Sequence, residues 1–269
     1  MRNDRRPEHR RHGGGAPSPS PRTDIGPTPG DRVRIFGLHA VAAALANPDR
    51  RHHRLYVTET AEPRFAAAIT ARGLAPERVQ PKDLDRRLGP DTVHQGALLE
   101  TGPLPERDVT ELGLRARTHG PLIVLDQVTD PHNVGAILRS AAVFDAAGLL
   151  MTRRHSPELS GALAKAASGA LELVPVALVT NLARAMEQLA ELGLTRVGLD
   201  GEAETLIEAA DLSGPVALVL GSEGRGLRRL TRESCDQLVR IGAPGAIASL
   251  NVSNAAAVAM HAASLQRRR

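Results

Sequence analysis

Two polar segments of this chain hold side chains that could bind and orient a ligand. The first contains Asn133 at a predicted helix start and Arg139 just under two helical turns further on, flanked by apolar residues. A partly buried arginine needs an anionic partner, and phosphate is a suitable one. The second segment, residues 221–226, sets Glu223 among three glycines, which let a ligand approach the backbone closely. Simpler interpretations exist: a helix cap, a surface ion pair and an ordinary glycine-rich turn.

A third segment, residues 241–254, joins a β-like run to an alanine-rich helix through an uncharged loop of small residues. Short polar side chains gather where that helix begins, with Ser249 and Asn251 among them. Amides and hydroxyls at such a position either cap the helix or hold a substrate. The segment alone is compatible with a capped C-terminal helix and with a binding loop.

Composition restricts the classes of function. The net charge of +4 and the isoelectric point of about 10.1 are compatible with nucleic-acid binding, and equally with arginine-rich codon usage. With no tryptophan, one tyrosine and three phenylalanines, the chain is a poor candidate for stacking single-stranded bases. Cys235 is the single cysteine, so we expect neither an internal disulfide nor a structural zinc site. Without a membrane-spanning apolar run or a secretory signal, the expected compartment is the cytoplasm.

Composition also divides the chain into four parts. Residues 1–31, rich in Arg, Pro and Gly, predict a disordered tail that either contacts RNA or is dispensable. Residues 32–101 alternate short strands and helices, which predicts a small α/β domain. Residues 102–119 read as a linker because glycine and proline punctuate them. Residues 120–269 form a second, larger α/β unit.

In the small unit, a helix is predicted to open at Phe36 and to run to about Ala46. The basic run at residues 50–54 either contacts phosphates or forms a solvated loop. In the larger unit, the continuous apolar runs at residues 121–126 and 216–220 are typical of buried parallel strands. Ligands bind at the carboxyl ends of such strands, and the three polar segments all fall there.

Together, these segments resemble the motifs of the SpoU (TrmH-like) class of SPOUT RNA 2′-O-methyltransferases, in order and in spacing. Motif one is represented by Asn133, Gly135 and Arg139, motif two by residues 218–227, and motif three by residues 249–253. The resemblance covers residues 32–266. Residues 36–41 and 94–96 are similar to the substrate-binding domain of the family, which looks like RNA-binding ribosomal-protein folds. The pattern is most similar to the branch that methylates a guanosine of 23S ribosomal RNA.

The resemblance implies a cofactor and an assembly. S-adenosyl-L-methionine would bind in a deep C-terminal trefoil knot, a very rare kind of topology. Gly221, Ile241 and Leu250 would line the cofactor pocket, mostly through backbone groups. A homodimer is implied, in which Arg139 of one chain crosses to the active site of the other. No metal is implied, and no histidine and cysteine cluster offers one.

The resemblance also implies catalytic roles. Arg139 would hold the target phosphate or ribose and stabilise negative charge that develops on the 2′-oxygen. A guanidinium hardly deprotonates in proteins, which argues against Arg139 as the general base. Asn133, Ser249 and Asn251 would orient the ribose and Arg139, while Glu223 would fix Arg139 or the loops.

One departure and three alternatives remain open at this point. The family commonly has Ile-Pro-Met before the glycine of motif three, whereas this chain has Ile241-Gly242-Ala243, which leaves the shape of the loop in question. A tRNA methyltransferase of the same family is the nearest alternative, and a non-catalytic RNA-binding factor for ribosome assembly is the second. A nicotinamide enzyme is disfavoured because the dinucleotide-binding glycine pattern is absent.

Overall fold

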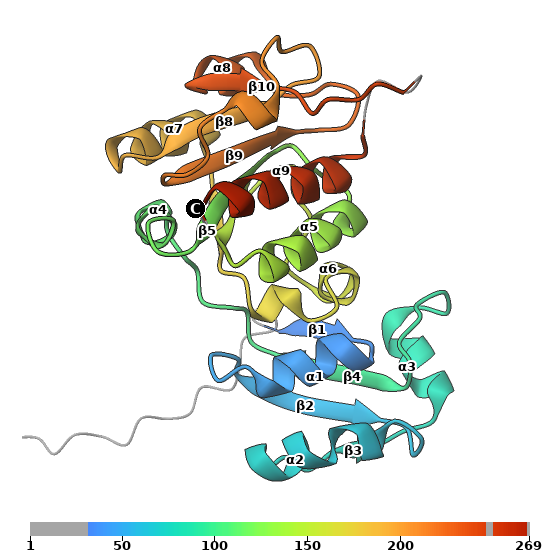
Figure 1. The fold of residues 1–269 in the computed structure, drawn as a ribbon. Coiled ribbons are helices and arrows are strands. Elements are labelled where there is room, and N and C mark those ends of the chain that lie inside the picture. The colour runs from blue at the N-terminus through green and yellow to red at the C-terminus, as the bar shows by residue number, and fades with distance from the viewer. Residues whose placement is uncertain (1–31, 246–249, 268–269) are drawn as a thin grey trace, which may run out of the picture.

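The computed structural model describes residues 32–245 and 250–267, which form two α/β units, the smaller one at the bottom of Figure 1. The predicted tail, residues 1–31, lies outside the described residues. Each unit is built around its own sheet, a mixed sheet of four strands in the smaller unit and a parallel sheet of six in the larger. The expected α/β class with a small N-terminal unit is confirmed.

The small unit has the strand order β1-β4-β2-β3, in which β4 pairs antiparallel with both β1 and β2. Its strands are β1 (Val33–Phe36), β2 (His52–Val57), β3 (Glu77–Arg78) and β4 (Ala97–Thr101). Its helices are α1 (Leu38–Ala46), the short turn η1 (Glu62–Phe65), α2 (Ala66–Arg72) and α3 (Pro81–Leu88).

The large unit has the strand order β10-β8-β9-β5-β6-β7, and all the pairings between neighbours are parallel. Its strands are β5 (Gly120–Asp126), β6 (Ala146–Thr152), β7 (Val176–Val179), β8 (Thr195–Leu199), β9 (Val216–Gly221) and β10 (Gln237–Val239). Its helices are α4 (Val109–Arg115), α5 (Pro131–Val143), α6 (Gly161–Ala166), α7 (Leu182–Glu191), α8 (Arg229–Glu233) and α9 (Val252–Arg267), with short turns η2 (Ala170–Glu172) and η3 (Ile207–Ala209).

The parallel sheet is covered on both faces because successive side chains of a strand point to opposite sides. In β5, Ile123 and Leu125 belong to the core on the side of α5 and α9, whereas Leu122 and Val124 belong to the core under α4 and α7. All four side chains are fully buried. A strand buried on both faces must be apolar throughout, which explains the continuous run in the sequence.

The structure corrects several element boundaries. The supposed linker contains α4, whose buried Leu112 packs between β6 and α7, so only the residues around it connect the units. The helix predicted to start at Asn133 begins two residues earlier, at Pro131, and ends at Val143 before β6 starts at Ala146. The segment before Gly37 is the strand β1 rather than the start of a helix.

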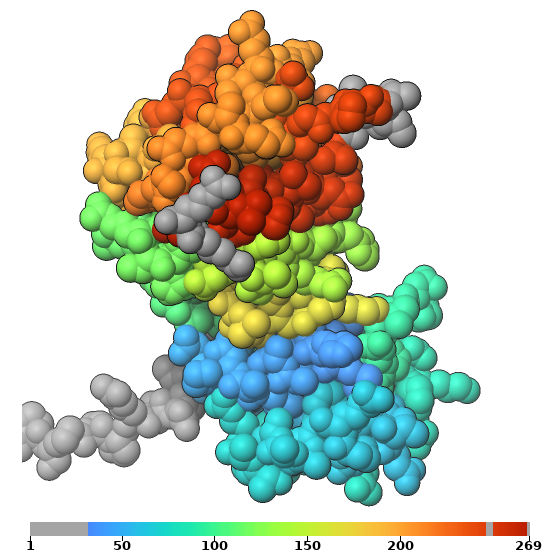
Figure 2. All heavy atoms as spheres, in the orientation of Figure 1, coloured from blue at the N-terminus to red at the C-terminus, as the bar shows by residue number. Residues whose placement is uncertain are grey.

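The two units pack closely against each other through α6 and β1 (Figure 1). A Cβ atom at Gly161 would lie 2.2 Å from a ring carbon of Phe36, so the first turn of α6 rests directly on the small unit. Figure 2 shows the N-terminal unit, in blue, against the yellow segment that contains α6 and η2. One continuous apolar cluster includes buried residues of both units, such as Val41 and Leu171.

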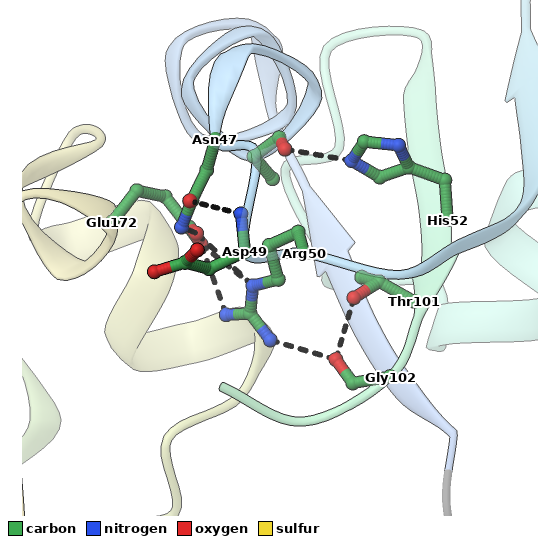
Figure 3. A network of polar contacts seen from close by, with 8 residues as sticks. Asn47, Asp49, Arg50, His52, Thr101, Gly102 and Glu172 are labelled. Carbon is green, nitrogen blue, oxygen red and sulfur yellow. Dashed lines mark hydrogen bonds and ion pairs between the residues drawn. The ribbon is translucent and has the colours of Figure 1, made fainter. Parts of the chain in front are cut away.

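A buried ion pair also crosses this junction (Figure 3). The side chains of Arg50 and Glu172 are 0% and 3% exposed, and the Arg50 Nη2 donates to Glu172 Oε1 at 2.9 Å. Asn47 Nδ2 donates to the other carboxylate oxygen at 2.7 Å, while Arg50 Nη1 donates to the Gly102 carbonyl at 2.8 Å. The basic run at residues 50–54 is therefore no uniform phosphate-binding patch, because its first arginine is internal.

No helix among the described residues is long and apolar enough to cross a bilayer. In the same residues, no group of three or more histidine, cysteine, aspartate or glutamate side chains has a metal-binding arrangement.

Candidate functional site

The first polar segment forms the start of α5, and its cap is Asp130 rather than Asn133. Asp130 accepts a hydrogen bond from the His132 amide at 2.9 Å, and Pro131 occupies the first helical position, where no amide hydrogen is needed. Because Asp130 fulfils the capping role, the Asn133 side chain is left for other contacts. The interpretation of Asn133 as a simple helix cap is therefore wrong.

Close packing behind α5 fixes where Asn133 lies. A Cβ atom at Gly135 would be 2.5 Å from the Cβ of Ala166 and 2.8 Å from its carbonyl carbon. A larger residue would push α5 away from α6, which itself rests on the small unit. Gly135 therefore allows α5 to pack closely against α6.

The second segment is a tight turn at the carboxyl end of β9. Ser222 and Gly226 form an antiparallel bridge, with the Gly226 amide donating to the Ser222 carbonyl at 2.9 Å. A Cβ at Gly221 would lie 2.0 Å from the carbonyl carbon of Gly226, so only glycine allows the turn to close. The closed turn holds Glu223 at its exposed tip.

In the third segment, Asn251 combines the two roles that the sequence left open. Its Oδ1 accepts from the Ser253 amide at 2.8 Å, which caps the first turn of α9. Its Nδ2 donates to Asn133 Oδ1 at 3.0 Å and to Glu223 Oε1 at 2.6 Å. Capping and site formation thus use opposite ends of one amide.

The three segments meet in a polar network of Asn133, Glu223 and Asn251. Asn133 Nδ2 donates to Glu223 Oε1 at 3.0 Å, so this one oxygen accepts from both asparagines. The second oxygen, Oε2, has no hydrogen-bond partner among the described residues. The network therefore has an acceptor left for a ligand or for a group from another chain.

Arg139 does not join this network within its own chain. Six residues of α-helix turn the side chain through about 600°, which leaves it about 120° away from Asn133 around the helix. Arg139 is exposed, and no hydrogen bond or ion pair connects it to another described residue. The expectation of a partly buried arginine is wrong. Without a partner in the described part of the chain, Arg139 is available to an external anion.

A cavity of about 590 Å³ lies beside the network, at the carboxyl ends of β8, β9 and β10. Gly221, Ile241 and Leu250, the three residues expected to hold a cofactor, all line it, and so do Glu223 and Asn251. Ser249 lies outside the described residues. Ala243, part of the unusual stretch in the third segment, is also in the wall.

Sequence reasoning missed two polar residues of this wall, Asp200 and Arg240. Asp200 directly follows β8, and its backbone amide donates to the Val239 carbonyl at 2.9 Å. The rule that ligands bind at the carboxyl ends of parallel strands would have selected Asp200, had it been applied to every strand.

Cys235 is unsuited to act as a nucleophile. Its Sγ donates to the Thr231 carbonyl at 3.3 Å, and burial raises the pKa of its thiol to about 12. Only the thiolate is a good nucleophile, so this cysteine is a packing residue under the sheet edge.

Comparisons with known proteins agree in both units. The model of the SpoU rRNA Methylase family matches residues 120–261, and the model for RNA 2′-O ribose methyltransferase substrate binding matches residues 34–107. The 23S rRNA (guanosine-2′-O-)-methyltransferase RlmB of Pseudomonas putida is 41% identical over 241 residues, which cover 87% of this chain and 96% of the relative. The protein of the same name from Shewanella oneidensis is 41% identical over 242 residues, covering 87% and 97%.

Among solved structures, the SpoU methyltransferase AviRb from Streptomyces viridochromogenes, in complex with the cofactor AdoMet, has a TM-score of 0.74 to this chain. The superposition covers 89% of this chain and 91% of that one at 24% sequence identity. At this identity the likeness concerns the fold, which extends over both units.

Proposed function

Because this chain belongs to the SpoU rRNA methylase family, we propose that it is an S-adenosylmethionine-dependent RNA 2′-O-methyltransferase acting on a guanosine of 23S ribosomal RNA. The observation that carries the proposal is the network of Asn133, Glu223 and Asn251 at the rim of the cavity. Three segments that are far apart in the sequence bring these polar side chains to one place. A ribosomal RNA substrate would place the enzyme in the cytoplasm.

The cavity suits S-adenosylmethionine in size and in chemistry. Pockets for small-molecule ligands commonly have volumes of about 300–1,000 Å³ and mostly apolar walls with a few polar groups. This one, of about 590 Å³, has apolar residues such as Leu220, Val239 and Ile241 together with glycine backbone. Gly221, Ile241 and Leu250 would hold the cofactor, which supplies an electrophilic methyl group on a sulfonium.

The protein must make a ribose hydroxyl attack that methyl group. Arg139 would bind the target nucleotide and stabilise negative charge on the 2′-oxygen as its proton leaves. Asn133 and Asn251 would orient the ribose, with Ser249 beside them, and Glu223 would hold the two asparagines through Oε1 while Oε2 stays free to hold Arg139. Holding both reactants in line supplies a large part of the rate of such a transfer.

Arg139 would reach this position from the second chain of a homodimer. Two features support this part of the proposal: Arg139 lies about 120° around its helix from Asn133, and it is exposed without a hydrogen-bond or ion-pair partner among the described residues. An arginine with no structural role in its own chain is free to complete a neighbouring site. We also expect the C-terminal trefoil knot of the family; residues 246–249, inside the segment concerned, lie outside the described residues.

Methylation of purified RNA tests the proposed substrate. The protein would be incubated with labelled S-adenosylmethionine and, separately, with unmodified 23S rRNA, 16S rRNA and bulk tRNA, and the product digested to nucleosides. We expect 2′-O-methylguanosine from 23S rRNA, at one position mapped by primer extension. Label in tRNA alone would assign the same chemistry to another substrate, and no transfer to any RNA, despite cofactor binding, would favour a non-catalytic RNA-binding factor.

A further inference from the structure

A second cavity, also of about 590 Å³, opens at the carboxyl ends of the other half of the large sheet. It lies where β5, β6 and β7 end, between the start of α7 and the start of α8. None of the side chains proposed for methyl transfer lines it. Its lining includes the basic residues Arg154, His155, Arg228 and Arg229, polar side chains such as Gln127 and Thr180, and a few apolar ones.

The charge of this wall is one-sided. Three arginines and a histidine line the cavity, and no aspartate or glutamate is found among its described lining residues. Arg229 has a partner, Glu233, at 2.8 Å on the surface of α8, where such a pair is weak. Backbone amides in the first turn of α7 add partial positive charge at the same wall. The cavity therefore favours an anion.

Arg228 is held in place for such a ligand. Its backbone amide donates to Asp126 Oδ2 at 3.0 Å, and its Nε donates to Asp126 Oδ1 at 2.6 Å. Asp126 is fully buried at the end of β5. The two terminal nitrogens of Arg228 have no hydrogen-bond partner among the described residues, and the side chain is 48% exposed. A guanidinium already fixed at one edge loses less freedom when the other edge binds an anion.

Arg154 faces the same space from the loop after β6. Two hydrogen bonds hold the loop at and just before this residue: Thr152 Oγ1 donates to the Arg154 carbonyl at 2.6 Å, and the Arg153 amide donates to the Val179 carbonyl at 2.8 Å. The Arg154 side chain is exposed and makes no hydrogen bond or ion pair with other described residues. The backbone at Arg154 is thus held in place, while its guanidinium is available to an anion.

The two cavities adjoin each other through one turn. Gly226 lines the cavity proposed for the cofactor, and Arg228 lines the second one. Consecutive Cα atoms are about 3.8 Å apart, so these two residues are at most ~7.6 Å apart. A chain of phosphates with a rise of ~3.4 Å per nucleotide covers this distance in two or three nucleotides. A polymer bound at the reaction site is therefore long enough to reach the second cavity as well.

We propose that the second cavity binds the phosphodiester backbone of the RNA substrate, a few nucleotides from the ribose that is methylated. This inference rests on the proposed function for its ligand. Arg154 and Arg228 contact non-bridging phosphate oxygens, and Arg229 adds a third, more mobile contact at the rim. The site is a positioning site: it sets affinity and register, and takes no part in methyl transfer.

Arg154→Ala is the first test. Arg229→Ala is a second variant, at an exposed position where the substitution should not affect folding. Arg117→Ala is the control for the loss of an exposed arginine away from the cavity; Arg117 lies before the amino end of β5, where its Nη2 donates to the Leu192 carbonyl at 2.9 Å. Affinity for a 23S rRNA fragment is measured by filter binding at several salt concentrations without cofactor. We expect Arg154→Ala to weaken binding about tenfold, which is the low end for a hydrogen bond to a charged group. The slope of log affinity against log salt falls by about 0.7.

Steady-state kinetics give a second readout, in which KM for RNA rises and kcat is unchanged. Binding curves for Arg154→Ala that coincide with those of Arg117→Ala overturn the assignment. So does saturable binding of inorganic phosphate that Arg154→Ala abolishes while RNA affinity is unchanged, since the ligand is then a free anion. Because binding is measured without methyl transfer, a protein that binds RNA through Arg154 but methylates none refutes the proposed function alone.

Discussion

Two polar clusters in this molecule are made of the same residue types and are put to opposite uses. At the domain junction, Asn47, Arg50 and Glu172 form a buried group in which both carboxylate oxygens are occupied (Figure 3). At the candidate site, two asparagines hold one oxygen of Glu223, and the arginine stands apart on the surface. At the junction, the Glu172 carboxylate and the Arg50 guanidinium have partners within the chain. At the site, Oε2 of Glu223 and the guanidinium of Arg139 have no partner among the described residues.

The difference shows how polar residues divide between stability and function. A buried charge must be paired and hydrogen-bonded because desolvation is expensive, so each group at the junction has its partner inside the protein. A group that is to bind substrate has to keep its capacity free until the substrate arrives. Unsatisfied polar groups at an exposed, ordered position are therefore better guides to function than the ion pairs that stand out in a fold.

The largest effect is expected at the junction. Arg50→Ala leaves the Glu172 carboxylate buried without its partner, and breaking such a pair costs about 3–5 kcal/mol of unfolding free energy. For a domain of this size that corresponds to a fall in Tm of roughly 10 °C. Calorimetry would measure it, and the double variant Arg50→Met with Glu172→Leu is the control, expected to recover most of the loss. An unchanged Tm in Arg50→Ala would show that the junction is hydrated.

In contrast to Arg50→Ala, Arg139→Ala is expected to leave Tm unchanged and to lower the rate of methyl transfer strongly. Loss of one group that stabilises developing charge typically lowers kcat by roughly 10²–10³. The rate of methyl transfer to 23S rRNA would measure this loss. Calorimetric titration with S-adenosylmethionine is the control, and it should show that the variant still binds the cofactor. Wild-type kcat in this variant contradicts the role given to Arg139.

The two asparagines should separate the roles that Asn251 combines. Asn251→Ala removes both the cap of α9 and the network, so it should lower stability by about 1 kcal/mol and also lower kcat. Asn133→Ala removes only the two hydrogen bonds of Asn133 in the network and leaves the cap of α5, which Asp130 provides, so it should lower kcat with little change in stability. Urea unfolding and single-turnover kinetics on both variants would check this. Equal stability losses would mean that capping by Asn251 is unimportant.

The smallest effect is expected at Cys235. With the pKa of the thiol raised to about 12 by burial, very little thiolate exists at pH 8, and iodoacetamide should react with the native protein far more slowly than with the unfolded one. Mass spectrometry would follow the reaction. Cys235→Ser should retain methyl transfer. Rapid alkylation that abolishes activity would place Cys235 in the working site.

The sequence was informative where local chemistry dominates. Continuous apolar runs predict β5 and β9 because strands buried on both faces are apolar throughout. Ligands bind at the carboxyl ends of parallel strands, and this rule places the three distant segments at one edge of the sheet. The residues Asn133, Glu223 and Asn251 followed from that rule and from the family resemblance. Their hydrogen-bond pattern did not, because it depends on Asp130 taking over the cap.

Features that depend on long-range packing could not be predicted. Arg50 reads as part of a basic surface run, and only the fold brings Glu172, 122 residues away, to its guanidinium. Gly113 and the nearby glycines and prolines predict a linker where the structure has the helix α4, because Leu112 packs into the core between β6 and α7. The exposure of Arg139 also depends on how α5 packs, which the periodicity of the sequence does not reveal.

We propose that Arg139 of one chain completes the cavity of another. Two inactive variants test it: Arg139→Ala, and Leu250→Trp, which would fill the cavity and should lose cofactor binding. Mixed dimers, purified through two different tags, contain one intact site only if Arg139 acts across the interface. We predict that they regain about half of the wild-type methyl transfer, since one of two symmetric sites is complete. Mixed dimers as inactive as either parent, or a protein that stays monomeric while active, would contradict the account.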